Sequence, residues 1–295
     1  MSLPRPVDGA LYHLQSCATS ATVVGPWPSP SVGAAAFHVS IPAEWSPVTV
    51  PAELTQLRRT VAQACRILAN AGLVEDILGH VSVRVGPDRM LVRCRGPQEE
   101  GLLFTLDRDV HLVEFDGGGD LPAGWAVPNE LPIHGELLRA RPEIDAVVHC
   151  HPPAVLVAGV EEVPLRPVFG AYHIPAARLA VDGIPIYPRA VLVRRPELGR
   201  ELVEAMGAST VCVMRGHGIT TVGSGAHAVE QALVRALAVD VLARVSVERA
   251  RLGDRAADLT PEDLAELPDL GSSFNDLNVW RHHLARLRLA GLALE

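Results

Sequence analysis

One short stretch, residues 146–153, restricts the fold of this chain most strongly. It reads Ala-Val-Val-His-Cys-His-Pro-Pro, so an apolar run ends in two histidines that one residue separates. Side chains alternate along a strand, and this alternation predicts that His149 and His151 share one face while Cys150 faces away. Two imidazoles so placed at the end of one strand are half of a metal site.

A second short run, residues 211–217, also ends in a histidine, His217, which stands between Gly216 and Gly218 at the predicted end of a strand. Glycine on both sides allows a sharp backbone turn and the close approach of a ligand. Three neutral imidazoles with open coordination positions suit a catalytic Zn²⁺, Mn²⁺ or Fe²⁺. The three histidines are therefore candidate ligands of one divalent metal ion.

Composition narrows the class of protein. At 295 residues, 48% of them hydrophobic, the chain can bury a full core in one large domain. A net charge of −8 without any dense block of Lys and Arg argues against a nucleic-acid or polyanion surface. No basic-then-apolar leader and no apolar run of about 18 residues is present, so we expect a cytoplasmic protein without a membrane segment.

The five cysteines are odd in number, widely scattered and mostly set in apolar runs. This pattern favours buried free thiols over a disulfide framework. They are Cys17, Cys65, Cys94, Cys150 and Cys212.

Three regions are predicted along the chain. Residues 1–50 are rich in Pro, Ser, Gly and Ala without periodicity, which indicates an N-terminal arm. Residues 51–255 form the predicted catalytic domain, and residues 256–295 a helical C-terminal tail. Short apolar runs alternate with segments of helical spacing, a pattern typical of an α/β layered domain. The predicted strands are 81–85, 90–95, 110–115, 146–151, 184–187 and 211–217. The predicted helices are 54–71, 129–140 with Asn129 as its cap, 196–206, 226–252 and one from 260.

Three segments, in this order, resemble the class II aldolase/adducin family: Glu-Leu-Pro-Ile-His at 130–134, Ala-Arg-Pro-Glu-Ile-Asp-Ala-Val-Val-His-Cys-His at 140–151, and Gly-His-Gly at 216–218. The resemblance covers roughly residues 52–250. It implies a three-layer α/β/α domain with a central mixed or antiparallel sheet, assembled as a homotetramer with active sites between subunits. It also implies one divalent metal ion per subunit.

By the same resemblance, His149, His151 and His217 match the metal ligands of the family and Glu130 its catalytic acid/base. His134 follows Glu130 by one helical turn on the same face, so it is a second catalytic candidate that holds the glutamate or the substrate; a structural histidine is the alternative. Tails in the family reach a neighbouring site, which makes candidates of Trp280, His282 and His283.

The chain departs from the sugar-phosphate aldolases of this family at two phosphate-holding positions. Where those aldolases have Gly-Asn in an early loop, this chain has Gly79-His80. Where they have Ser-Ser before the glutamate, it has Pro128-Asn129. A phosphorylated substrate is therefore not expected. Arg93 and Arg95 stand on one strand face, where paired guanidinium groups can grip a carboxylate; a solvated strand face is the alternative.

Residues 169–178 and 184–189 resemble the decarboxylase-type members that act on hydroxylated aromatic acids such as a dihydroxyphthalate. Tyr172 and His173 in the first of these segments are, with His80, Asn129 and the two arginines, the candidate substrate contacts. We therefore expect a metal-dependent decarboxylase of a small, non-phosphorylated carboxylic acid. Glu130 would protonate the carbon that CO₂ leaves, a role favoured by a carboxyl pKa raised by burial.

Three other functions remain open at this point. One is an aldolase or retro-aldol lyase on a hydroxy-keto acid, and another is a mononuclear iron oxygenase on the same scaffold. The third is a non-catalytic binding protein of the adducin type, which would lack an intact metal set, whereas all three histidines are present here.

Overall fold

The computed structural model describes residues 51–255, 257–268, 270 and 272–294. The predicted N-terminal arm, residues 1–50, and Cys17 within it lie outside the described residues. The limits predicted for the catalytic domain and for the C-terminal tail stay predictions.

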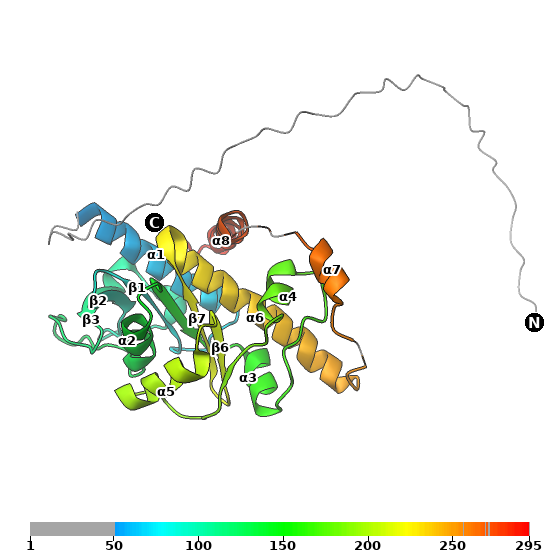
Figure 1. Ribbon diagram of the computed structural model, residues 1–295. Helices are drawn as coiled ribbons and strands as arrows, with labels where there is room; N and C mark the ends of the chain where they lie inside the picture. Colours follow the sequence, from blue (N-terminus) through cyan, green and yellow to red (C-terminus); the bar gives the residue numbers. More distant parts are fainter. Residues whose placement is uncertain (1–50, 256, 269, 271, 295) are drawn as a thin grey trace, which may run out of the picture. The chain divides into compact units, whose positions relative to one another are not determined.

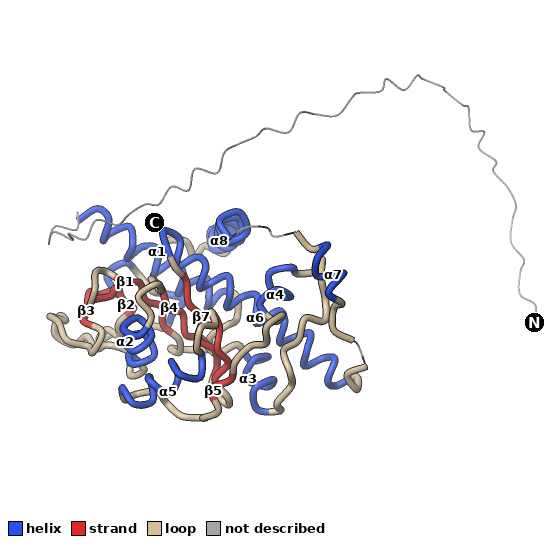
Figure 2. The backbone as a smooth tube through the Cα atoms, viewed as in Figure 1, coloured by secondary structure: helices blue, strands red, loops and turns tan. Residues whose placement is uncertain are grey.

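A single seven-stranded sheet forms the centre of the described chain, in the order β3-β2-β1-β4-β7-β6-β5 (Figure 2). Every neighbouring pair is antiparallel except β5 and β6, which run parallel. Of the two predicted forms, mixed or antiparallel, the sheet is mixed. The strands are β1 (His80–Arg84), β2 (Arg89–Arg93), β3 (Val110–Glu114), β4 (Ala146–Cys150), β5 (Ile186–Tyr187), β6 (Val211–Met214) and β7 (Gly218–Gly223).

Helices cover both faces of this sheet and complete the three layers (Figure 1). Helices α1 (Pro51–Asn70) and α6 (Ala228–Arg251) pack on one face, and α2 (Leu131–Ala140) and α5 (Pro196–Met206) on the other. Each helix buries its apolar stripe against the sheet, which removes both apolar surfaces from water. The remaining helices are α3 (Pro153–Val160), α4 (Ile174–Leu179), α7 (Pro261–Glu266) and α8 (Ser272–Leu289), with short 3-10 turns at 102–104, 107–109 and 225–227.

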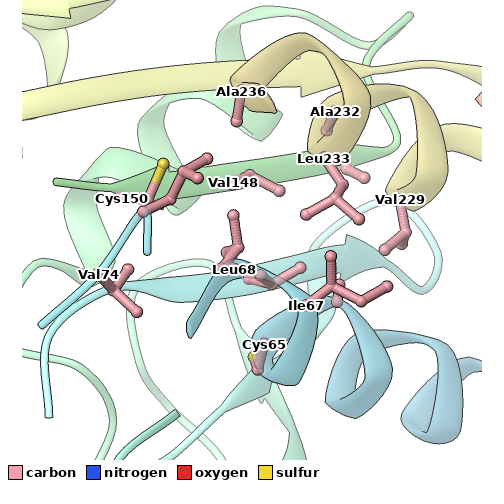
Figure 3. Packing of buried hydrophobic residues seen from close by; sticks show 14 of the residues in the cluster. Cys65, Ile67, Leu68, Val74, Val148, Cys150, Val229, Ala232, Leu233 and Ala236 are labelled. Atoms are coloured by element: carbon pink, nitrogen blue, oxygen red, sulfur yellow. The ribbon is translucent and has the colours of Figure 1, made fainter. Parts of the chain in front are cut away.

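The central strand β4 shows the predicted alternation. Val148 and Cys150 point into the cluster beneath α1 and α6, whereas Val147 belongs to the cluster beneath α2 and α5. His149 therefore faces the α2 side and Cys150 faces away from it, as the sequence predicts. Figure 3 shows Val148 and Cys150 packed among Ile67 and Leu68 of α1 and Val229, Ala232, Leu233 and Ala236 of α6.

Three elements were not predicted. Strand β7 begins and ends in glycine and carries two threonines, so its apolar signal is weak; it forms because its backbone pairs with β4 and β6 on either side. The prediction that His217 ends a strand is therefore wrong: β6 ends at Met214, and His217 lies in the hairpin loop between β6 and β7. Helices α3 and α4 are short, and each starts with a proline in its first turn.

Helix α2 begins two residues later than predicted. Glu130, not Asn129, occupies the cap position, and no side chain makes a capping hydrogen bond there. The carboxylate of Glu130 instead accepts a hydrogen bond from the backbone of Val193, which draws it away from the helix end.

The C-terminal residues pack on their own chain. Helix α8 packs against α1 and α6, and both Trp280 and His283 are buried in the single chain, while His282 is exposed. The four described cysteines are buried free thiols, as predicted. Among the described residues, none of the helices combines the length and the apolar character that a membrane span requires.

Candidate active site

Four potential metal-binding side chains converge from three separate parts of the fold. Glu130 precedes α2, His149 and His151 stand at the end of β4, and His217 lies in the β6–β7 loop. Their ligand atoms all lie within 4.8 Å of one another. The three imidazole centroids are 4.8, 4.9 and 5.0 Å apart, so the rings surround a common point.

Sheet pairing explains the position of His149. In the register of the sheet it stands between His80 of β1 and Thr220 of β7. The hydroxyl of Thr220 lies 3.4 Å from Nδ1 of His149, which leaves Nε2 directed at the site. That Nε2 atom is 2.8 Å from Nε2 of His151.

The donor set fits a divalent metal ion. Burial, followed by the neighbouring histidines, lowers the pKa of His151 to about 3, and burial also lowers the pKa of His149. Both rings are therefore neutral near pH 7 and offer nitrogen lone pairs. Three imidazoles beside one carboxylate suit Zn²⁺, Mn²⁺ or Fe²⁺.

Glu130 is held from two sides. Its Oε2 lies 3.5 Å from Nε2 of His149, and its Oε1 lies 3.4 Å from Nε2 of His217. The N–H of Val193 donates to Oε1 over 2.9 Å. Burial raises the pKa of this carboxyl, but hydrogen bonding from His149 and His217 outweighs burial and holds the pKa below its usual range. The expected raised pKa is therefore wrong, and the resting carboxylate is ionised.

His80 and His134 lie behind Glu130. Nε2 of His80 is 3.9 Å from Oε2 of Glu130, and its ring stacks on that of His149 with centroids 5.0 Å apart. Nδ1 of His80 lies 2.6 Å from Nε2 of His134, whose Nδ1 lies 2.6 Å from the hydroxyl of Ser82. His134 therefore reaches Glu130 only through His80.

The other predicted substrate contacts are placed differently. The two neighbours of Arg93 along the chain, Val92 and Cys94, belong to the cluster beneath α2 and α5. Arg93 therefore points to the opposite face of the sheet, where it pairs with Glu99. Arg95 forms a backbone bridge with Ala126. Asn129 is exposed directly before Glu130.

Tyr172 and His173 make local contacts in the segment before α4. Tyr172 is 74% exposed and its ring meets that of Phe169 edge to face. Nδ1 of His173 accepts the N–H of Ala176 and caps α4. Neither of these contacts involves Glu130 or the three clustered histidines.

Three contributors were missed by the sequence analysis: Ser82, Thr220 and the backbone of Val193. Ser82 could have been predicted from the sequence, because it follows His80 by two residues and so shares its strand face. Thr220 and Val193 could not have been predicted, because their positions depend on strand pairing and on the path of a loop.

The comparisons with known proteins agree with this geometry. The family described as Class II Aldolase and Adducin N-terminal domain matches residues 59–247. A 3,4-dihydroxyphthalate decarboxylase of Arthrobacter keyseri is 50% identical over 250 residues, which are 83% of this chain and 98% of that protein. The protein of the same name in Terrabacter sp. (strain DBF63) is 51% identical over 233 residues, 78% of this chain and 96% of its own.

Among solved structures, an aldolase II superfamily protein from Pseudomonas syringae superposes with a TM-score of 0.69 at 20% identity, covering 83% of this chain and 96% of its own. The chain belongs to the class II aldolase and adducin family.

Proposed function

We propose that this protein is a metal-dependent decarboxylase of a hydroxylated aromatic dicarboxylic acid, with 3,4-dihydroxyphthalate as its candidate substrate. The observation that carries the proposal is the complete cluster of Glu130 and three histidines. It occurs in a chain half identical to proteins named for this activity across almost their entire length. These relatives favour decarboxylation over the aldolase, iron oxygenase and binding-protein alternatives.

The metal would be held by His149, His151 and His217, whose ring nitrogens converge on one point. When bound there, a divalent cation supplies a Lewis acid that stabilises negative charge developing on substrate oxygens. Glu130 remains available for proton transfer.

The ionised carboxylate of Glu130 determines the order of proton transfers. It first takes the proton of a substrate hydroxyl and later delivers it to the ring carbon that carried the departing carboxylate. The carbon–carbon bond breaks, CO₂ leaves, and the bonding electron pair ends in the new C–H bond. The hydroxyl oxygen regains a proton from solvent.

Burial of the site supports this transfer. Glu130, His80 and His149 are each at least nine-tenths buried, so few water molecules compete for the proton. The Val193 N–H and the His217 ring hold Oε1, while Oε2 faces His80 and His149. The carboxylate is thereby fixed in one orientation before substrate arrives.

The direct test is incubation of metal-loaded protein with 3,4-dihydroxyphthalate. We expect release of one CO₂ for each dihydroxybenzoate formed. Aldehyde and pyruvate from a hydroxy-keto acid, with no CO₂ from the phthalate, would show an aldolase instead.

The identity of the metal, the homotetrameric assembly and the cytoplasmic location are parts of the same proposal. Arg95 and Asn129 as substrate contacts belong to the same proposal, whereas Arg93 is buried beside Glu99 on the far face of the sheet. Elemental analysis, light scattering of the purified protein and cell fractionation measure the first three.

A further inference from the structure

A chain of three buried polar side chains leads from Glu130 into the sheet. We call His80, His134 and Ser82 the His-His-Ser chain; its two internal contacts are both 2.6 Å. His80 is 5% exposed, and His134 and Ser82 are fully buried. His80 and Ser82 come from β1 and His134 from α2, so the chain joins the sheet to the helix that follows Glu130.

When Glu130 is ionised and both rings are neutral, the chain permits one arrangement of protons. A carboxylate only accepts, so Nε2 of His80 carries the hydrogen that faces Oε2. Nδ1 of His80 then lacks a hydrogen and accepts from Nε2 of His134. Nδ1 of His134 in turn accepts from the hydroxyl of Ser82. Each neutral ring carries one proton, and every contact has one donor and one acceptor.

Packing supports the same arrangement. Both rings are buried, and removal from water disfavours the charged imidazolium form. The ring of His80 also stacks on His149, with 28° between the planes. Stacking on one side and a short hydrogen bond on the other leave this ring little freedom to rotate.

We propose that Ser82 and His134 are positioning residues that fix the tautomer of His80, so that its Nε2–H faces Oε2 of Glu130. The N–H dipole attracts the carboxylate across 3.9 Å, an electrostatic contact longer than a hydrogen bond. Oε2 thus keeps one orientation during proton transfer. The catalytic consequence rests on the proposed function, whereas the tautomer itself does not.

Imidazole ¹⁵N NMR of the wild-type protein tests the tautomer directly. The resonances of His134 are assigned by their absence in His134→Gln. We expect Nε2 protonated and Nδ1 bare in both His80 and His134. Observation of the Nδ1–H tautomer in His134 overturns the proposal, whatever the enzyme does with substrate.

Ser82→Ala removes the donor that selects this tautomer. We expect mixed His134 tautomers and a kcat about 10–100-fold lower, with KM and metal content unchanged. Ser82→Thr keeps a hydroxyl and is expected to restore one tautomer and most of kcat. The matched control is Ser246→Ala, because Ser246 is a buried serine of α6 whose hydroxyl has no hydrogen-bond partner in the described part of the chain.

The two failures are distinguishable. If wild-type protein does not decarboxylate dihydroxyphthalate, the proposed function fails, and the ¹⁵N spectra still decide the tautomer. If wild-type protein is active and Ser82→Ala, folded by circular dichroism, matches its kcat and its His134 spectrum, the positioning role is overturned.

Discussion

Gly218 lies directly against the ring of His151. A Cβ atom built on Gly218 would stand 2.7 Å from Cδ2 of His151 and would overlap the carbonyl oxygen of Cys150. Strands β4 and β7 therefore come together at the site only because residue 218 lacks a side chain. This close approach keeps His151 beside the loop that carries His217.

Substitution of that glycine is expected to disturb the metal site. In Gly218→Ala the methyl group must displace His151 or the backbone of β4, at a cost of about 1–3 kcal/mol in the free energy of unfolding. Metal content should fall with it, as measured by elemental analysis after dialysis. Gly159→Ala is the control, because its Cβ would meet Val213 at an ordinary 3.4 Å. Equal metal content in both variants would contradict the role of Gly218.

Glu130→Gln is expected to separate metal binding from turnover. The three histidines remain, so the metal content should be unchanged, whereas kcat should fall by about 10²–10⁴-fold because an amide cannot shuttle the proton. Stopped assays for CO₂ measure the loss. Glu136→Gln on the same helix is the control, because Glu136 pairs with Arg139 and Arg200 outside the site. Normal turnover in Glu130→Gln would refute the assigned role.

Removal of any one metal-binding histidine is expected to lower metal occupancy. His149→Ala, His151→Ala and His217→Ala each delete one of three converging nitrogens. We expect less than one equivalent of metal in each variant and loss of activity that added metal restores only partly. His227→Ala supplies the control, since His227 is exposed and lies beside Glu230. Full occupancy in all three variants would exclude the proposed ligand set.

Arg66 is expected to anchor the C-terminal segment. Its buried guanidinium donates to the carbonyl oxygens of Thr105 and Leu292, both over 2.7 Å. Arg66→Met leaves these acceptors without their donor and should lower the free energy of unfolding in urea by about 1–3 kcal/mol. Arg59→Met, which removes a half-exposed arginine with one bond to Leu294, should cost less than about 1 kcal/mol. Equal losses would contradict the anchoring role.

His283 is expected to make the packing of α8 sensitive to acid. Burial, followed by the charge of His282 and Arg286, lowers the pKa of His283 to about 4. The unfolded chain binds a proton at His283 near pH 6.5, whereas the folded chain resists it, so stability falls as the pH drops from about 6.5 toward 4. His283→Gln should flatten the fall in melting temperature over this range. His227→Gln, at an exposed histidine outside α8, should not; an identical slope in both variants would contradict the assignment.

Much of the fold follows from local sequence patterns. Period-two alternation along β4 correctly predicts that His149 and Cys150 face opposite layers, because a strand has only two faces. Helix α5 has the predicted bounds because Pro196 starts it and Gly207 follows it. The same patterns miss β7, whose threonines and glycines become a strand only between two paired neighbours.

For the site, the sequence alone identified the four side chains that cluster in the structure: an acid before a helix, two histidines at a strand end and a third between glycines. It could not determine their partners. The tertiary structure decided that His80 stacks on His149, that His134 binds Ser82 rather than Glu130, and that Arg93 faces away from the site. Strand register and the packing of α2 on the sheet bring these groups together. Such contacts join residues distant along the chain, so no local pattern encodes them.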